Sequence, residues 1–165
     1  MTIYTLLDSP LGKLALTSDG GHLTGIHFPR RDGRPAVERA WQRDDAAPVL
    51  ARARTQLAEY FDGRRTRFDL PLRPAGTAFQ QSVWRALLKV PFGRTSTYGA
   101  LAAEIGRPTA ARAVGAAVGA NPLAVVVPCH RIIGADGTLT GYAGGLPRKT
   151  KLLALEGTRG VGHGR

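Results

Sequence analysis

Residues 125–131 have the sequence Val-Val-Val-Pro-Cys-His-Arg and contain the only cysteine of the chain. This grouping offers nucleophilic chemistry, because Cys129 can attack and His130 can take up a proton. The apolar β-branched run predicts a buried strand, which Pro128 ends because proline cannot donate to a ladder. Cationic neighbours such as His130 and Arg131 lower a thiol pKa from about 8.5 into the reactive range. We interpret Cys129 as a reactive thiol at a rigid strand end, and a buried structural cysteine is the alternative.

Composition places these residues in a basic globular protein. Of the 165 residues, 43% are hydrophobic, which is ordinary for a folded chain, and the length suits one domain or two small ones. There are 23 Lys and Arg against 12 Asp and Glu, a formal net charge of +11. Such a surplus favours a polyanionic partner, nucleic acid first and an anionic membrane surface second. The excess of arginine over lysine is also what a GC-rich genome produces.

The sequence gives few signs of a cofactor or a membrane. A single cysteine excludes an internal disulfide framework and indicates a reducing compartment. The N-terminus lacks the pattern of a signal peptide, and no apolar run approaches the ~18 residues of a membrane helix. His22 and His27 are too far from any cysteine or carboxylate cluster to indicate a metal site. We expect a soluble, cytoplasmic protein with no metal and no cofactor.

The first part of the chain has the pattern of a small α/β unit. Residues 12–17 and 23–28 alternate as half-buried strands do, and the turn residues between them predict a hairpin. Residues 30–45 mix Arg, Asp, Gly and Pro, which is typical of an exposed connection. Apolar residues recur at helical spacing over residues 48–61, and Gly63 ends the predicted helix.

A mostly helical part follows the linker that residues 70–77 predict with two prolines and a glycine. Residues 79–90 predict one helix. A helix-turn-helix comes next, with a short helix over residues 98–105 and a second over residues 110–120 with Thr109 as its N-cap. The second helix carries many small side chains, which let another surface come close. Either a packed helix or a nucleic-acid groove fits that pattern.

The remaining elements surround and follow the cysteine motif. Residues 132–137 predict a strand end and a turn, and the glycines of residues 140–145 permit close backbone approach to a ligand. Residues 147–155 predict a final helix. The expected organisation is an α/β domain of antiparallel sheet plus helix with its linker, a mostly helical domain, and a flexible Gly- and Arg-rich tail, over residues 1–76, 77–158 and 159–165.

The motif around Cys129 resembles the active-site motif of the O6-alkylguanine-DNA alkyltransferases, the methylated-DNA–protein-cysteine methyltransferases of DNA repair. Five further elements match the family in order and at compatible spacing. They are Tyr98, residues 111–115, Asn121-Pro122, residues 141–145 and residues 155–157. The resemblance is close over residues 77–158, whereas the N-terminal part fits only in size and α/β pattern. It implies a ribonuclease-H-like first domain and a second domain that binds DNA and accepts the alkyl group.

The resemblance implies direct-reversal repair, in which the alkyl group of O6-alkylguanine or O4-alkylthymine moves irreversibly to Cys129. Each molecule then acts once. His130 activates the thiol through a water, and Glu156 orients His130. Tyr98 donates a proton to the leaving guanine, and Asn121 braces the active-site turn. Without the resemblance, a surface carboxylate at a helix end is the preferred interpretation of Glu156.

The implied partner is double-stranded DNA, bound through the minor groove by a monomer that can cluster on DNA, with the target base flipped out. Arg112 matches the residue that fills the vacated space in the base stack. Tyr142, Ala143 and the carbonyl of Ile132 match the walls of the pocket around the base. Further DNA contacts fall on residues at and before the start of the same helix: Thr109, Ala111, Ala113 and Gly115.

The chain also departs from some members of the family. It has no second cysteine for the N-terminal zinc site that some carry, and Ala143 stands where others have serine. A non-catalytic DNA-binding module that uses the same helix-turn-helix is the rival function from another class. A cysteine hydrolase is a weaker reading, since no oxyanion-hole motif is visible. Permanent mass gain on Cys129 separates alkyl transfer from both.

Overall fold

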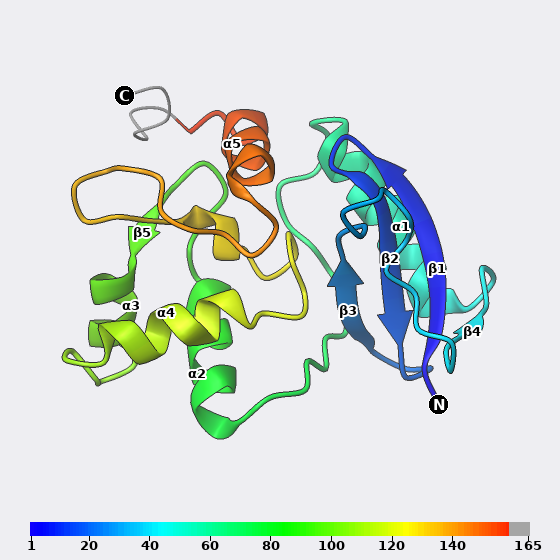
Figure 1. Cartoon of the computed structure of the whole chain (residues 1–165), viewed down its shortest axis with the longest axis horizontal. Helices are drawn as coiled ribbons and strands as arrows, with labels where there is room; N and C mark the ends of the chain where they lie inside the picture. Colours follow the sequence, from blue (N-terminus) through cyan, green and yellow to red (C-terminus); the bar gives the residue numbers. More distant parts are fainter. Residues whose placement is uncertain (159–165) are drawn as a thin grey trace. The chain divides into compact units, whose positions relative to one another are not determined.

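The structure, a computed structural model, describes residues 1–158 (Figure 1). The chain forms two compact units, Met1–Ala75 and Gly76–Arg165, each with its own sheet. The tail that the sequence predicts to be flexible, residues 159–165, lies outside the described residues.

The first unit is built on a four-stranded sheet in the order β3-β2-β1-β4. β1 (Ile3–Ser9), β2 (Gly12–Ser18) and β3 (Leu23–His27) pair antiparallel, which confirms the predicted hairpin. The sequence did not indicate β1. β4 (Gln42–Arg43) pairs parallel with β1 and corrects the expectation that this stretch is only an exposed connection. A two-residue strand with exposed side chains has no alternation from which it could be predicted.

One helix, α1 (Pro48–Phe61), packs against this sheet (Figure 1) and confirms the prediction over the same residues. Pro48 suits the first turn, where a backbone N–H has no partner within the helix. Leu50 and Leu57 are fully buried on the face toward the sheet. Gly63 follows the helix with a φ of 77°, a left-handed conformation that favours glycine and ends the helix.

The second unit begins with α2 (Ala78–Leu87), which starts at a capping box formed by Thr77 and the third residue of the helix. Buried Trp84 donates from its Nε1 to the carbonyl of Ala117, at 2.8 Å. Ala117 belongs to α4 (Ala111–Gly119), so this bond joins α2 to the second helix of the helix-turn-helix. It fixes the helix that carries the expected DNA contacts.

α3 (Tyr98–Glu104) and α4 form the predicted helix-turn-helix. The side chain of Thr97 caps α3 by accepting a backbone N–H at 3.1 Å. The expectation that Thr109 caps α4 is wrong, because Ala110 holds the capping position and offers no side-chain bond. The backbone N–H of Ala110 donates to the carbonyl of Arg107 at 2.9 Å, so the chain makes one more turn before α4 begins.

The reactive motif lies between short elements that pair with one another. β5 (Ser96–Thr97) pairs parallel with β6 (Ile132–Ile133), and the single-turn helix η1 (Cys129–Arg131) comes directly before β6. α5 (Leu146–Leu155) is the final described helix and packs against η1. It begins one residue before the predicted start.

The predicted strand over residues 125–127 is wrong. These residues form a buried turn, because the side chain of Asn121 takes bonds that a ladder would otherwise supply. Its Nδ2 donates to the carbonyl of Val127 at 2.9 Å, and its Oδ1 accepts from the N–H of Leu123 at 2.9 Å. Val125 adopts a φ of 73°, an uncommon conformation for a β-branched residue. Cys129 therefore follows a turn that Asn121 stabilises, and not a strand.

Candidate functional site

Cys129 is the first residue of η1 and is buried, with 7% of its surface exposed. Burial raises the pKa of its thiol, and hydrogen bonding from Asn121 and Tyr142 and the charge of Lys149 oppose this rise. The expectation that the sequence neighbours lower the thiol pKa is therefore wrong for this environment. A thiol with a raised pKa is protonated near neutral pH, so it needs a base to react.

His130 follows Cys129 in η1, is fully buried and forms a pair with Glu156, with 2.7 Å between Nε2 and Oε2. A carboxylate can only accept, so the proton of the neutral imidazole lies on Nε2. The lone pair is then on Nδ1, which has no hydrogen-bond partner in residues 1–158. The structure thus leaves one nitrogen of His130 able to accept a proton.

Glu156 is buried, with 4% of its surface exposed, so it is not the surface carboxylate that its place at a helix end allowed. Arg131 grips both of its oxygens, with Nε 2.8 Å from Oε1 and Nη2 2.9 Å from Oε2. Burial alone would raise the pKa of Glu156, but the hydrogen bonds from His130 and Arg131 lower it to about 2. The carboxylate is therefore ionised throughout the physiological range.

Lys149 is a site residue that the sequence analysis missed. It is 1% exposed on the buried face of α5, and its ammonium donates to the carbonyl of Ile132 and, at 3.4 Å, to that of Thr140. Burial lowers its pKa to about 8, and the charge of Cys129 opposes the shift. Its position three residues before buried Leu152 was the available signal, since a lysine on an apolar stripe needs buried partners.

The expected walls of the substrate pocket come from β6 and the segment before α5, and Tyr98 at the start of α3 contacts that segment. The hydroxyl of Tyr98 lies 3.0 Å from Oγ1 of Thr140. The backbone carbonyl of Thr140 accepts from the ammonium of Lys149. Ile132 is buried, Tyr142 is half-buried, and Ala143 is exposed. Tyr98 and Ile132 are thus joined through Thr140 and Lys149, whose charge acts on the thiol, while Ala143 lies at the surface.

Comparison with known proteins agrees with this arrangement. The family model of the 6-O-methylguanine DNA methyltransferase ribonuclease-like domain matches residues 2–74, and that of its DNA binding domain matches residues 78–158. The chain is 47% identical over 154 residues to the methylated-DNA–protein-cysteine methyltransferase of Haemophilus influenzae, covering 93% of this chain and 85% of that one. The chain belongs to the O6-methylguanine DNA methyltransferase family.

Solved structures from this methyltransferase family share the fold. The O6-methylguanine methyltransferase of Mycobacterium tuberculosis is 48% identical with a TM-score of 0.85, over 94% of this chain and 93% of that one. M. tuberculosis OGT in complex with DNA is 47% identical with a TM-score of 0.85, over 93% and 92% of the two chains. These likenesses confirm the α/β fold class, with a ribonuclease-like first domain and a helical second domain.

The expected DNA contacts lie on the open side of α4. Ala111, Arg112 and Ala113 are exposed, as is Thr109 in the preceding turn. Gly115 is half-buried, and a Cβ at this position would lie 3.7 Å from the ring of Tyr98. The opposite side of α4 is buried in the domain through Val114, Ala117 and Val118. Arg112 is therefore exposed, while the opposite face of its helix packs into the domain.

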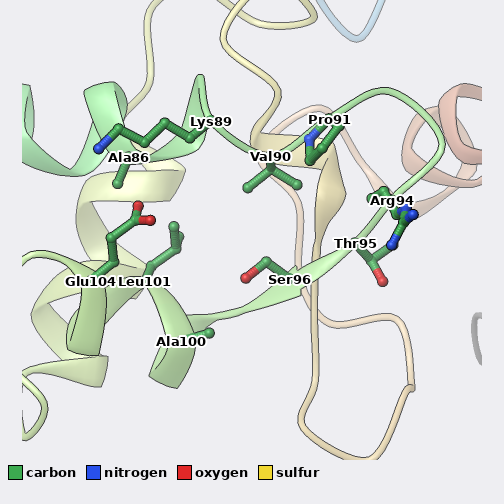
Figure 2. A pocket seen from close by; sticks show the side chains of 10 residues that line it. All are labelled: Ala86, Lys89, Val90, Pro91, Arg94, Thr95, Ser96, Ala100, Leu101 and Glu104. Carbon is green, nitrogen blue, oxygen red and sulfur yellow. The ribbon is translucent and has the colours of Figure 1, made fainter.

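A separate pocket of about 320 Å³ lies at the C-terminal end of α2, beside β5 and α3 (Figure 2). None of the residues that line it is among the expected site residues. They are Ala86, Lys89, Val90, Pro91, Arg94, Thr95, Ser96, Ala100, Leu101 and Glu104. Across residues 1–158, no helix is both long and apolar enough to cross a membrane, and no cluster of three or more His, Cys, Asp or Glu could hold a metal ion.

Proposed function

We propose that Cys129 is the alkyl acceptor in direct-reversal DNA repair, the activity of a methylated-DNA–protein-cysteine methyltransferase. The sulfur attacks the saturated carbon of the alkyl group, and an S–C bond forms as the bond between that carbon and guanine O6 breaks. The thiol proton passes to Nδ1 of His130 through a water. The guanine leaves with the electron pair and takes a proton from the hydroxyl of Tyr98. The thioether has no route back, so each molecule reacts once.

The observation that carries this proposal is the buried His130–Glu156 pair, whose histidine directly follows the buried Cys129 in η1. Glu156 is ionised and accepts from Nε2, so Nδ1 is the nitrogen that can receive a proton. The thiol has a raised pKa and so depends on that base. Nucleophile, base and orienting carboxylate then follow the logic of other activated nucleophiles. Asn121 supports them by bracing the turn that presents Cys129.

DNA binding fits the second unit, and we place the partner on the open side of α4. Residues 76–158 contain nine Lys and Arg against three Asp and Glu, one of which is buried Glu156. The small exposed residues Ala111 and Ala113 let the helix backbone approach DNA in the minor groove. Extrusion of the target nucleotide requires on the order of a few kcal/mol, and the side chain of Arg112 would fill the space it leaves. One monomer per O6-alkylguanine is the expected stoichiometry.

Intact mass spectrometry with a duplex that contains O6-methylguanine tests the function. The wild-type protein should gain one methyl group per molecule, located on Cys129 by peptide mapping. Cys129→Ser should bind the duplex yet gain no mass, because a hydroxyl is a far weaker nucleophile of nearly the same shape. Binding without mass gain by the wild-type protein would indicate a DNA-binding module. Repeated turnover without mass gain would indicate a hydrolase.

A further inference from the structure

Arg131 serves the buried network of the site and not the thiol beside it in sequence. Two of its nitrogens hold the carboxylate of Glu156, and Nη1 donates to the carbonyl of Val90 at 2.7 Å. Its guanidinium also lies over the ring of Phe92, 5.8 Å from the centroid. Val90 lies in the turn after α2 and lines the pocket in Figure 2, so the guanidinium is also bonded to that turn. With 7% of its surface exposed, Arg131 is not placed to hold DNA.

A base that accepts the thiol proton has to be neutral before the reaction. A buried carboxylate beside an imidazole favours the imidazolium, since the opposite charge stabilises the protonated ring. An imidazolium carries protons on both nitrogens, so Nδ1 of His130 could then accept nothing. Glu156 alone would thus orient the ring and, at the same time, draw a proton onto it. The guanidinium of Arg131 supplies the positive charge that balances Glu156 instead.

The charged groups around His130 support these separate roles, in which Glu156 orients the ring and Arg131 balances the charge of Glu156. Three ionisable side chains act on His130: Glu156, Arg131 and Lys149. Burial has the largest effect and lowers the pKa of His130, Glu156 raises it, and Arg131 and Lys149 lower it. Glu156 and Arg131 therefore act on the histidine in opposite senses while they are bonded to each other.

We propose that Arg131 is a positioning residue for alkyl transfer: it holds Glu156 in place and balances its charge, so that His130 rests neutral with Nδ1 ready to accept the thiol proton. This inference rests on the proposed role of His130 as the base. It assigns two separable contributions to Arg131. Its charge keeps the histidine neutral, and its planar two-point grip sets the direction in which the carboxylate, and hence the ring, is held.

The test is the pH dependence of single-turnover methyl transfer from a saturating O6-methylguanine duplex, followed by intact mass from about pH 5 to 9. Arg131→Gln removes the charge, and the acid limb should move up by about 1 pH unit or more. The direction holds whichever proton arrangement of the Cys129–His130 pair dominates at rest, because loss of a cation favours the next proton on either. Arg131→Lys keeps the charge, so its acid limb should stay near that of the wild type while its plateau rate falls about tenfold.

Arg85→Gln is the matched control, since it removes the same charge from an exposed position on α2 and should change neither the limb nor the plateau. An acid limb that stays in place in Arg131→Gln overturns the proposal. If the Arg131 variants do not fold, ¹⁵N NMR of wild-type His130 decides: a neutral ring protonated on Nε2 near neutral pH supports the proposal, and an imidazolium overturns it. A wild-type protein that gains no methyl group contradicts the proposed function instead, and the same assay shows this.

Discussion

The two units use ion pairs in opposite ways. In the first unit the pairs lie at the surface: the side chains of Lys13 and Asp8 are 45% and 86% exposed, and those of Arg34 and Asp32 are 80% and 48% exposed. In the second unit the pair between Arg131 and Glu156 is buried, with side chains 8% and 0% exposed. Exposed pairs contribute about 0–1 kcal/mol, whereas removing one partner of a buried pair costs about 3–5 kcal/mol. Ion pairs therefore add little to the stability of the first unit, whereas in the second unit a buried ion pair holds the candidate site together.

Charge is distributed just as unequally. Residues 1–75 hold 12 Lys and Arg against nine Asp and Glu, while residues 76–158 hold nine against three. The first unit thus nearly balances its own charge. Most of the positive surplus belongs to the second unit, which is also the part that matches the family's DNA binding domain. Attraction to the phosphates of DNA is expected to come mainly from that unit.

The sharpest test of the contrast in ion pairs is a matched pair of amides. Glu156→Gln leaves Arg131 buried and unpaired, so it should lower the free energy of unfolding of the second unit by about 3–5 kcal/mol. Asp8→Asn removes an exposed partner in the first unit and should change stability by less than about 0.5 kcal/mol. Urea unfolding in a Trp41→Phe background makes buried Trp84 the fluorescence probe of the second unit. Equal effects of the two amides would contradict the comparison.

Low pH should weaken the Arg131–Glu156 ion pair, and with it the stability of the second unit, without a mutation. The pKa of Glu156 is about 2 in the folded chain, below the value of about 4.3 for an unfolded glutamate. The stabilisation is therefore complete above the unfolded pKa and is lost as the pH falls through the folded one, an effect of about 3 kcal/mol. Urea unfolding of the second unit near pH 6 and near pH 3 should show more than half of this loss, about 1.7 kcal/mol, because pH 3 still lies about one unit above the folded pKa. In Glu156→Gln the difference between the two pH values should shrink, and an unchanged difference would assign the acid sensitivity to other carboxylates.

How far the sequence predicted the fold depended on whether the signal was periodic. α1 has an apolar stripe at helical spacing and was predicted with the observed ends. Residues 125–127 are apolar and β-branched yet form a turn, because the bonds that decide their conformation come from the side chain of Asn121. The spacing of hydrophobic residues gives no information on a hydrogen bond between a side chain and a backbone group several residues away.

The same limit applies to the site. Motif order indicated Cys129, His130 and Glu156, but it could not indicate that Arg131 turns toward a carboxylate 25 residues away. Lys149 was passed over because a lysine is ordinarily read as solvent-exposed. Its burial follows from carbonyls of two other segments that converge on it, and only the tertiary structure brings those together.

The contrast in charge between the units can be tested at single arginines. Arg112→Ala should slow repair of an O6-methylguanine duplex by about tenfold, because extrusion of the base loses the group that fills its place. The loss should be smaller on a single-stranded oligonucleotide with the same lesion, and Arg112→Lys should fall between wild type and alanine on the duplex. Arg52→Ala removes an exposed cation of the first unit, paired with Asp69, and should leave both rates unchanged. Equal losses on duplex and single strand would mean that Arg112 supports the fold or the pocket.

The smallest expected effect concerns Gly115, where α4, the helix proposed to contact DNA, packs against Tyr98. A Cβ there would lie 3.7 Å from the ring of Tyr98, an ordinary contact, whereas a Cβ on Gly119 would meet nothing within 4 Å. Gly115→Ala should therefore raise the free energy of unfolding of the second unit by about 0.5–1 kcal/mol, since alanine loses less backbone entropy inside a helix. The methyl group would point toward Tyr98 and not outward, so duplex affinity and the transfer rate should stay within about twofold of wild type.

Gly119→Ala, at the last residue of α4, is the control, because a Cβ there has no neighbour within 4 Å. A slower transfer on single-stranded substrate in Gly115→Ala alone would show that the ring of Tyr98 has been displaced, and that this glycine is required by the reactive site and not by the helix.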